Sequence, residues 1–317
     1  MKAAVYTQYG TPDVVQLKEV EKPMPKEHEV LVRIKGTAVN SGDVRMRKAD
    51  PFAVRFIFGF FTPRIPVLGA VFSGEVASVG KQVKTFKPGD QVFGHTDMRF
   101  GAHAEYICVA ESGSITLKPA TLSHAEAATI PFGAVTALHF LKKAAIMPNQ
   151  KVLIVGASGA VGSAAVQLAR YYGARVTAVC STGNRELVKS LGAERVIDYT
   201  KEDFTQQAET YDVIFDTVNS IAVPKALQVL NDKGTLILSA AGMKEMLQGA
   251  WFGAVKGRSI LNGVIGHSAT EIQLLKELVD SGIYKPVVDR TYPLAQIAAA
   301  HAYVEQGHKK GNVAIAV

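Results

Sequence analysis

Residues Lys151–Ala169 read KVLIVGASGAVGSAAVQLA, and this stretch decides the fold. Val152–Val155 is a short apolar run rich in β-branched residues, which is typical of a strand buried on both faces. The small residues of Gly156–Gly162 allow a tight turn and let backbone approach a ligand closely. From Ser163 the pattern is helical. A strand, a glycine turn and a helix form the context of a dinucleotide-binding motif, in which the helix N-terminus holds a pyrophosphate.

The glycine turn fits the G-x-G-x-x-G frame with one departure. Ala157 takes the place of the first glycine, and Gly159 and Gly162 take the other two. Many glycine turns only close a strand–helix unit, but here a helix and a second strand follow at the distances that nucleotide binding requires. We therefore predict cofactor contacts from Ala157, Ser158, Gly159, Ala160, Val161 and Gly162.

The end of the second strand, Arg175–Val179, decides which nicotinamide cofactor binds. An NAD site usually carries Asp or Glu there, to bind the ribose 2′-OH. This chain instead continues with Ser181, Thr182 and, after two residues, Arg185, whose hydroxyl and guanidinium groups can receive a 2′-phosphate. The same residues also suit an ordinary helix start with Ser181 or Thr182 as its cap, and both interpretations can hold at once. We favour NADPH over NADH.

Composition narrows the class of protein. The chain has 317 residues, enough for two domains, and its net charge of +7 comes from scattered basic residues rather than a basic stripe. Nucleic acid is therefore not expected as a partner, whereas an anionic cofactor is favoured. The chain has two cysteines, Cys108 and Cys180, and no C-x-x-C pair, so neither a four-cysteine zinc lobe nor a disulfide framework is possible. We expect no signal peptide, no membrane span and a cytoplasmic location.

Residues 1–120 are predicted to be all-β and to form a compact, barrel-like domain of short strands. The predicted strands are Ala3–Tyr6, Val14–Glu19, Glu29–Ala38, Gly74–Val79, Gln91–Phe93 and Phe100–Val109. Asn40-Ser41-Gly42-Asp43 interrupts this pattern, and an Asx turn that caps a following helix is one interpretation. His95 and His103 lack a third ligand at metal spacing, so we expect both to be hydrogen-bonding histidines.

An aromatic segment follows at Pro51–Pro66, which reads PFAVRFIFGFFTPRIP. It contains Phe52, Phe56, Phe58, Phe60 and Phe61. The segment suits a partly buried core piece, a membrane-touching loop or an apolar lid over a substrate. We favour the lid, because loops over pockets often carry such aromatics.

The second half of the chain alternates strands and helices. Ser123 and Glu126 form a capping box that starts a helix over Ser123–Ile130, and a second helix is predicted over Phe132–Ala145. Further strands are predicted at Val176–Val179, Arg195–Ile197, Val213–Phe215, Leu236–Leu238 and Ser259–Ile265, with helices at Arg185–Ser190 and Ala222–Leu230 between them. This alternation predicts an α/β fold with a doubly wound, parallel Rossmann sheet.

The last fifty residues lose the alternation. Helices are predicted at Thr270–Ser281 and Leu294–Gln306, and strands at Val287–Thr291 and Val313–Val317. The simplest topology returns this part to the first domain. We therefore predict one domain from 1–122 plus 269–317 and a second, cofactor-binding domain from 123–268.

Motifs along nearly the whole chain resemble one family. They are AVNSGD (38–43), VFSGEVASVG (71–80), KPGDQVFG (87–94), PFGAVTAL (131–138), VGASGAVG (155–162), SLGAERVIDYTKEDF (190–204), DVIFDTV (212–218) and HKKGNV (308–313). Together they look like the medium-chain dehydrogenase/reductase superfamily, and its zinc-free quinone oxidoreductase branch fits best. The resemblance implies a GroES-like barrel completed by the C-terminus, a Rossmann domain and, as is usual in the family, a homodimer.

Departures from the zinc-dependent alcohol dehydrogenases of the same superfamily are equally informative. Those enzymes have Cys where this chain has Asn40, and His and Glu where it has Ala70 and Val71. A third ligand position, near Phe132, is also apolar. A catalytic zinc needs three or four N, S or O ligands, so the resemblance implies an enzyme without a metal.

The resemblance also implies the chemistry. Without zinc, hydride from NADPH would go to a substrate that is already electrophilic, such as a small apolar quinone or an α,β-unsaturated carbonyl. Asn40 could donate a hydrogen bond to the developing oxyanion, and Arg45 stands where related reductases have Tyr. Thr136 matches a threonine that borders the nicotinamide, Tyr199 matches a tyrosine near the 2′-phosphate, and Val218 is included among the cofactor contacts. The aromatic segment, together with Trp251 and Phe252, would form an apolar substrate region.

Two other functions stay open at this point. An enoyl-thioester reductase would need a basic entrance for a coenzyme A or phosphopantetheine tail, for which Arg55, Arg64 and Lys256 are available. A non-catalytic NADPH-binding protein, serving as a sensor, an interaction partner or a membrane-surface module, is compatible with the lack of an obvious catalytic acid.

Overall fold

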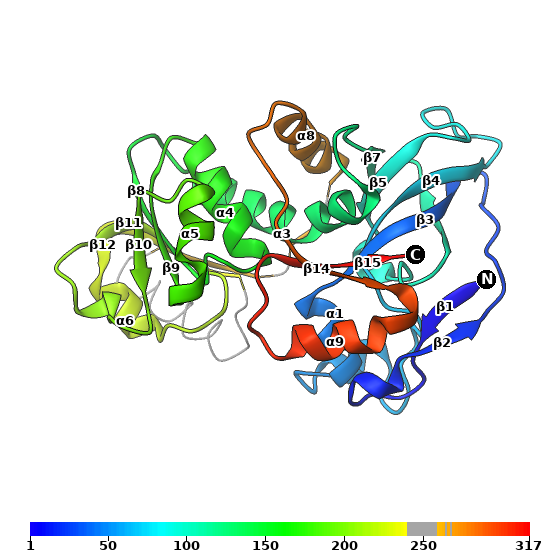
Figure 1. The fold of residues 1–317 in the computed structure, drawn as a ribbon, viewed down its shortest axis with the longest axis horizontal. Helices are drawn as coiled ribbons and strands as arrows, with labels where there is room; N and C mark the ends of the chain where they lie inside the picture. Colours follow the sequence, from blue (N-terminus) through cyan, green and yellow to red (C-terminus); the bar gives the residue numbers. More distant parts are fainter. Residues whose placement is uncertain (240–258, 264, 267) are drawn as a thin grey trace. The chain divides into compact units, whose positions relative to one another are not determined.

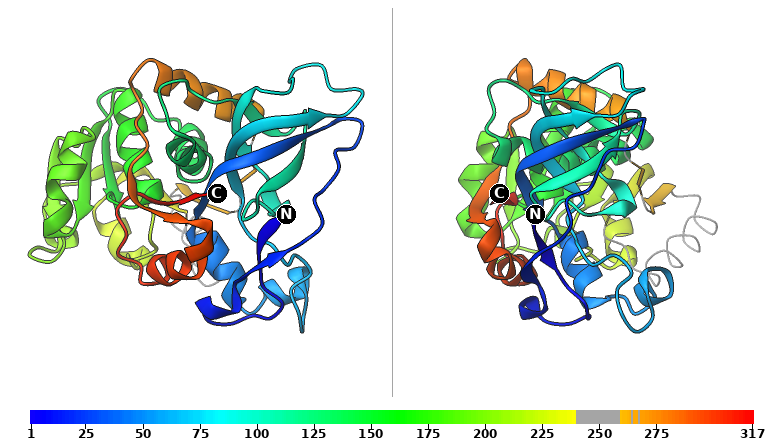
Figure 2. Two further views of the ribbon diagram at one scale, coloured as in Figure 1. Left: turned by 45° about the vertical axis from the view of Figure 1, so that its right-hand side comes forward. Right: turned by 90° about the vertical axis from the view of Figure 1, so that its right-hand side faces the viewer.

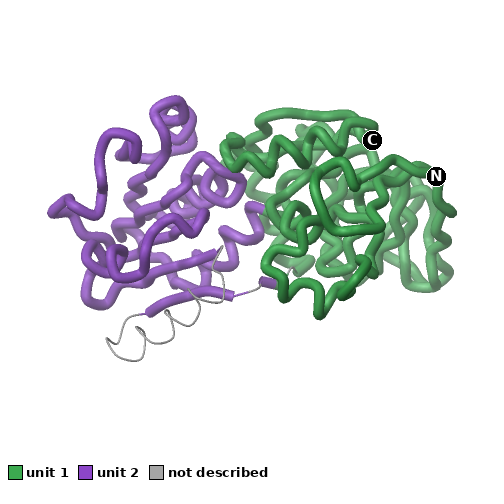
Figure 3. The backbone as a smooth tube through the Cα atoms, turned by 90° about the horizontal axis from the view of Figure 1, so that it is seen from below, with its two compact units in different colours: residues 1–132, 266–317 green, residues 133–265 purple. Residues whose placement is uncertain are grey.

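The computed structural model describes residues 1–239, 259–263, 265–266 and 268–317. The chain forms two compact units: unit 1 contains Met1–Phe132 and Gly266–Val317, and unit 2 contains Gly133–Ile265 (Figure 3). The domain limits 1–122 plus 269–317 and 123–268 stay a prediction from the sequence. No helix within the described ranges is long and apolar enough to cross a membrane.

Unit 2 is built on a parallel sheet. Its described strands are β8 (Lys151–Val155), β9 (Arg175–Cys180), β10 (Arg195–Asp198), β11 (Tyr211–Asp216), β12 (Leu230–Leu238) and β13 (Ser259–Asn262). Their order is β10-β9-β8-β11-β12-β13, and every neighbouring pair is parallel. The prediction of a doubly wound sheet is confirmed. In such sheets ligands bind where the strand order reverses, which here is at the carboxyl ends of β8 and β11.

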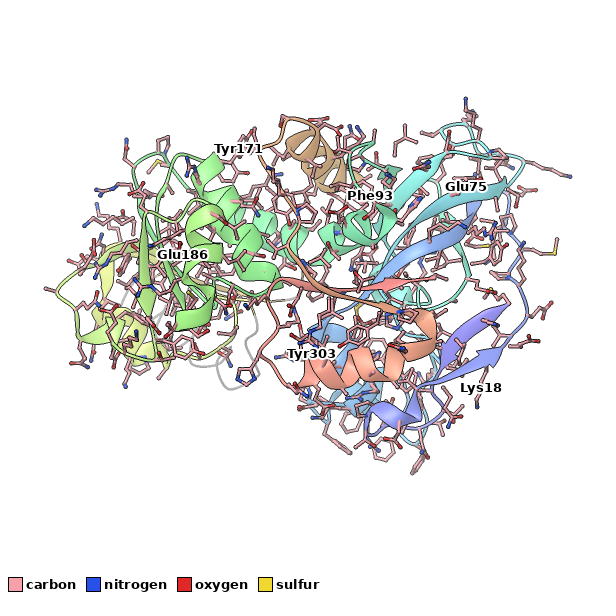
Figure 4. The ribbon with its side chains drawn as sticks, viewed as in Figure 1. Lys18, Glu75, Phe93, Tyr171, Glu186 and Tyr303 are labelled. Carbon is pink, nitrogen blue, oxygen red and sulfur yellow. The ribbon has the colours of Figure 1, made fainter. Side chains whose placement is uncertain are left out.

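Helices and short turns connect these strands. They are α4 (Ala160–Tyr171), η3 (Thr182–Asn184), α5 (Arg185–Ser190), η4 (Phe204–Gln206) and α6 (Val223–Gln228). Figure 1 shows α4 and α5 beside the sheet, and Figure 4 labels Tyr171 at the end of α4 and Glu186 in the first turn of α5. The interior strands bury apolar side chains completely, among them Leu153, Ile214 and Leu236. This is why they read as continuous apolar runs.

Helix α3 (His124–Lys143) corrects the sequence analysis, which expected two helices separated near Pro131. The helix is continuous and contains Pro131. A proline removes one helical hydrogen bond and crowds the preceding turn. On both sides of it, however, Ala127, Ile130 and Ala134 are fully buried, and this packing holds one helix across the proline. The predicted capping box is confirmed, because Ser123 N–H donates to Glu126 Oε2 (2.9 Å) and Glu126 N–H donates to Ser123 Oγ (3.3 Å).

Unit 1 holds the second large sheet. Its described strands are β3 (Glu29–Val39), β4 (Val71–Val79), β5 (Gln91–His95), β6 (Tyr106–Ala110), β7 (Ser114–Leu117), β14 (Val288–Pro293) and β15 (Asn312–Ala316). The order is β14-β15-β3-β4-β5-β7, with β6 also paired to β3. Val313 of β15 pairs with Val39 of β3, so the predicted return of the C-terminus to the first part of the chain is confirmed (Figure 1).

Smaller elements complete unit 1. They are β1 (Lys2–Val5), η1 (Pro12–Val14), β2 (Gln16–Glu19), α1 (Ser41–Lys48), α2 (Val54–Phe58), η2 (Asp97–Arg99), α8 (Ala269–Asp280), η5 (Leu294–Gln296) and α9 (Ile297–Glu305). Strands β1 and β2 form a separate antiparallel pair. Thr116 of β7 donates a hydrogen bond to Gln273 of α8 (2.7 Å). Phe93 of β5, labelled in Figure 4, is fully buried.

The prediction that residues 1–120 are all-β was wrong in two places. Helices α1 and α2 lie between β3 and β4. The strand expected over Phe100–Val109 begins only at Tyr106, and Phe100 (φ +53°) and Gly101 (φ +97°) adopt positive-φ conformations that do not continue a regular strand. Strand β7 was missed altogether. It is four residues long and too short to give a clear alternation of apolar and polar side chains.

Candidate functional site

Two glycines shape the turn after β8. Gly156 has φ +73°, and a Cβ there would lie 2.6 Å from Val218 Cγ1. A Cβ at Gly162 would lie 2.1 Å from the Gly156 carbonyl oxygen and 2.7 Å from Ala157 Cα. Both contacts are too short for any other residue type. The glycines therefore let α4 start directly against the strand end, as nucleotide-binding turns do.

Ala157 does not occupy the first-glycine position of the turn that we predicted for it. It is fully buried, and its N–H donates to the Val179 carbonyl at 3.1 Å, so this donor belongs to the sheet. Gly156 makes the left-handed turn that the frame assigned to the position of Ala157. The sequence signal for this turn was Val155-Gly156, because a glycine directly after a buried strand is well placed to supply a positive φ.

The N-terminus of α4 presents backbone N–H donors. Gly159 is its N-cap, and no described side chain caps the helix there. The N–H groups of Ala160, Val161 and Gly162 belong to the first turn, where an α-helix provides no carbonyl partners. A Cβ at Gly159 would meet its nearest described atom, the Gly156 oxygen, only at 3.4 Å. Backbone donors, a positive dipole end and an open approach at Gly159 fit the pyrophosphate of a dinucleotide.

Asn184 joins the two cofactor turns, and the sequence analysis missed it. Its Nδ2 donates to Ser158 Oγ (3.0 Å) and to Ser181 Oγ (3.2 Å), and the residue is only 9% exposed. The turn after β8 is thereby tied to the turn after β9. The sequence did contain a signal, an amide side chain three residues after Ser181 in the cap-like sequence S-T-G-N. The sequence analysis assigned the capping role to Ser181 or Thr182 and gave Asn184 none.

Thr182 is engaged by a carboxylate. Its Oγ1 donates to Asp198 Oδ2 at 2.5 Å, and Thr200 Oγ1 donates to Asp198 Oδ1 at 2.7 Å. These hydroxyl donors hold the pKa of Asp198 below its usual value. The sequence search looked for a carboxylate only after β9. Asp198 ends the neighbouring strand β10, where it pairs in register with Cys180.

The remaining predicted cofactor residues lie around these turns in unit 2. Arg185 begins α5 and is half-buried, whereas Tyr199 is 58% exposed after β10. Thr136 is buried in α3, one turn beyond Gly133, whose Cβ would lie 2.6 Å from the Ala160 oxygen. This close approach places the middle of α3 against the start of α4.

The loop after β11 is fixed by a buried acid. Asp216 is fully buried and accepts hydrogen bonds from the N–H groups of Val218 (3.0 Å), Ser220 (2.8 Å) and Ile221 (2.9 Å). Burial raises the pKa of Asp216, and the three donors counteract that effect. Val218 is thus held beside Gly156, and it is 52% exposed.

Asn40 is the N-cap of α1 in unit 1. Its N–H donates to Asp43 Oδ2 (2.8 Å) in a capping box, and Asp43 Oδ1 accepts the N–H of Gly69 (3.0 Å). The residue is 2% exposed, yet its Nδ2 has no hydrogen-bond partner among the residues that the structure describes. A buried amide donor without a partner is costly, so it is well suited to receive an oxygen from a bound substrate.

Arg45 lies on the exposed side of α1, one turn after Asn40. The positions that hold zinc ligands in related alcohol dehydrogenases carry buried Ala70 and Val71. Within the described ranges, no group of three or more His, Cys, Asp or Glu side chains is placed to hold a metal ion.

The two histidines that we considered as ligands both make hydrogen bonds. His95 Nδ1 accepts the N–H of Asp97 (2.7 Å), and His103 Nε2 lies 3.1 Å from the Ala38 carbonyl oxygen. Trp251, Phe252 and Lys256, which the sequence analysis considered for substrate contacts, lie outside the described residues.

Comparison with known proteins identifies the family. Residues 26–120 match the alcohol dehydrogenase GroES-like domain, residues 133–235 match the alanine dehydrogenase/PNT C-terminal domain, and residues 191–315 match the zinc-binding dehydrogenase model. The chain is 36% identical to a 2-methylene-furan-3-one reductase of Solanum lycopersicum over 99% of its own length and 79% of that protein. It is 33% identical, over the same shares, to a chloroplastic NADPH-dependent alkenal/one oxidoreductase of Arabidopsis thaliana.

A solved structure agrees with these relatives. The quinone oxidoreductase from Coxiella burnetii superposes with a TM-score of 0.90 at 27% identity, covering 100% of this chain and 99% of the other. The chain therefore belongs to the medium-chain dehydrogenase/reductase superfamily, in its quinone oxidoreductase branch.

Proposed function

We propose that this chain is an NADPH-dependent reductase that delivers hydride to quinones or α,β-unsaturated carbonyls without a metal ion. The observation that carries the proposal is Asn40, whose buried Nδ2 has no hydrogen-bond partner among the described residues. By the family resemblance, this position holds a zinc ligand in the zinc-dependent alcohol dehydrogenases. A neutral amide donor suits a substrate that is already electrophilic. Relatives named for alkenal, furanone and quinone reduction support this substrate class.

The cofactor would be held by unit 2. The first-turn N–H groups of α4 would bind the pyrophosphate, and Thr136 and Val218 would contact the nicotinamide half. Ser181 and Arg185 would receive a 2′-phosphate, with Tyr199 beside it, and the net charge of +7 favours the more anionic NADPH. Asp198 is directed at Thr182 and Thr200 rather than at Ser181, which is compatible with a phosphate at Ser181.

Asn40 and Arg45 would act on the substrate oxygen. The reduced nicotinamide, when bound, supplies the hydride. As negative charge develops on the carbonyl or quinone oxygen, Asn40 Nδ2–H donates a hydrogen bond to it and Arg45 adds a positive charge nearby. A guanidinium does not release its proton at neutral pH, so water provides the proton that completes the enol or quinol. A cytoplasmic location and a homodimer stay part of the proposal.

The test follows oxidation of the reduced nicotinamide with a quinone and with a water-soluble enone, with and without a chelator. We expect turnover with NADPH, little with NADH and no effect of the chelator. Arg185→Gln should raise the KM for NADPH about tenfold or more and leave NADH unchanged, since a charge-assisted phosphate contact is lost. Arg175→Gln, at the opposite end of β9 in an exposed ion pair with Glu194, is the matched control.

Three results would contradict the proposal. Chelator-sensitive turnover would mean that a metal takes part. Coenzyme A thioesters reacting far better than small enones would favour an enoyl-thioester reductase. Tight NADPH binding without turnover on any of these substrates would favour a non-catalytic sensor.

A further inference from the structure

Residues 51–66, here called the aromatic loop, expose an unusual amount of apolar surface. Its exposed apolar side chains are Phe52 (57% exposed), Phe56 (67%), Ile57 (68%), Phe60 (44%) and Phe61 (83%). Single exposed apolar residues need no explanation, but a contiguous group of this size usually marks an interaction surface. Figure 2 shows the loop in medium blue on the outside of unit 1.

The exposed rings form one patch. The ring centroids of Phe56 and Phe60 lie 5.7 Å apart, those of Phe52 lie 6.0 Å from each of them, and Phe60 and Phe61 are 5.0 Å apart. These are edge or tilted contacts at ordinary distances. The rings thus make a continuous apolar surface instead of separate contacts with solvent.

The backbone beneath the patch is fixed to unit 1. In the described segment 51–66, Phe58 is the phenylalanine that faces inward, and its ring contacts Phe100 with centroids 6.2 Å apart. Tyr9 donates through its hydroxyl to the Gly59 carbonyl (2.7 Å), and Arg64 N–H donates to the Phe58 carbonyl (2.7 Å). The other rings lie outside the core, because each of them is at least 44% exposed. The structure therefore corrects the core interpretation of this segment for Phe52, Phe56, Phe60 and Phe61.

The segment also carries two arginines. Residues 51–66 contain Arg55 and Arg64 and no acidic residue. The Arg55 guanidinium lies over the rings of Tyr9 (4.7 Å) and Phe52 (5.3 Å), and its Nη1 donates to the Phe60 carbonyl (3.4 Å). Arg64 is exposed. The patch therefore combines aromatic rings with positive charges at its rim.

We propose that the aromatic loop docks this protein peripherally on anionic lipid surfaces. Aromatic side chains favour the boundary between headgroups and acyl chains, and arginines there attract acidic headgroups. The net charge of +7 acts in the same direction over longer distances. A second copy of the chain fits less well, because a two-fold contact through this patch would bring Arg55 and Arg64 against the same arginines of the other copy.

The test is co-sedimentation of the full chain with vesicles of equal parts phosphatidylcholine and phosphatidylserine, and with vesicles of phosphatidylcholine alone. We expect binding to the first that weakens with salt, and much weaker binding to the second. Phe56→Ser combined with Phe61→Ser should lower the partition coefficient about tenfold or more. Arg64→Gln should lower it about fivefold. Met24→Ser removes an apolar side chain that is 86% exposed elsewhere in unit 1, and it should bind as the parent does.

Several outcomes would overturn the proposal. Failure of the parent protein to bind the acidic vesicles would do so, as would equal binding by the double phenylalanine variant. If that variant binds vesicles normally but has a raised KM for a water-soluble enone, the loop is a substrate lid. If the parent chain self-associates without vesicles and the variant does not, the patch is an interface between copies. Sedimentation needs no turnover, so its result is independent of the proposed reaction.

Discussion

Asn40 illustrates how one residue serves two purposes. From the sequence alone, an Asn before Ser-Gly-Asp is equally compatible with the N-cap of a helix and with a residue that contacts the substrate. The structure places it in a capping box with Asp43, while its buried Nδ2 has no hydrogen-bond partner in the part of the chain that the structure describes. The oxygen side of the amide can serve the helix, and the nitrogen side is available for a ligand. The two interpretations therefore do not compete.

This division predicts the effect of Asn40→Asp. The carboxylate keeps a capping oxygen, but it puts a second negative charge in a buried position beside the Asp43 carboxylate, so the thermal midpoint should fall. It replaces a donor with a negative charge, so kcat/KM for enone reduction should fall by about a hundredfold or more. Thermal denaturation measures the first effect, and steady-state kinetics measure the second. An unchanged kcat/KM would show that Asn40 only caps α1.

Asn184 is a positioning residue whose effect differs from that of Arg185. Asn184→Ala removes the link between Ser158 and Ser181, so both cofactor turns lose their mutual support. We expect the Kd to rise about tenfold for NADPH and for NADH alike, since one or two hydrogen bonds are lost. Fluorescence titration measures both values. A loss confined to NADPH would mean instead that Asn184 contacts the 2′-phosphate.

At the scale of the element, the start of α4 depends on a single small residue, Gly162. A Cβ at Gly162 would meet backbone atoms, which cannot move aside as a flexible side chain could. Gly162→Ala should therefore lower the free energy of unfolding by about 1–3 kcal/mol and weaken cofactor binding. Gly183→Ala is the control, because no described atom lies within 4 Å of its Cβ position. Chemical denaturation of the two variants side by side measures the difference, and equal stabilities would contradict the packing argument.

Element boundaries show where local sequence rules fail. Helix α5 (Arg185–Ser190) was predicted to the residue, because a cap-like turn precedes it and a glycine soon follows it. Helix α3 was divided wrongly at Pro131, because the rule for proline considers the local backbone and not the fully buried residues on either side. The gap between Phe100 and Tyr106 depends on two left-handed residues that the apolar pattern did not reveal.

At the scale of the molecule, unit 1 contains a buried polar cluster that makes stability depend on pH. His301 of α9 is fully buried, its ring centroid lies 5.7 Å from that of His103, and buried Arg47 pairs with Glu305 (2.6 Å). Burial lowers the pKa of His301 well below 6.5, and His103 and Arg47 add to this effect. In the folded protein the ring stays neutral under conditions in which the unfolded chain takes up a proton.

The sign of the pH effect follows. Above its unfolded pKa of 6.5, His301 is neutral in both states and costs nothing. As the pH falls below that value the unfolded state gains a proton first, so the free energy of unfolding should drop by about 1.4 kcal/mol per pH unit. His301→Leu should remove this part of the slope. Urea denaturation across this range tests it, and an equal slope in the variant would assign the effect to other groups.

The sequence by itself determined the fold class, the parallel sheet, the nucleotide turn and the return of the C-terminus to the first sheet. These features depend on patterns that neighbouring residues carry: apolar runs, glycine turns and caps. Only the tertiary structure decided that Asp198 engages Thr182, that Asn184 links two loops and that Asn40 Nδ2 has no hydrogen-bond partner among the described residues. Each of these depends on residues that are distant in sequence and meet only when strands pair, so no local pattern encodes them.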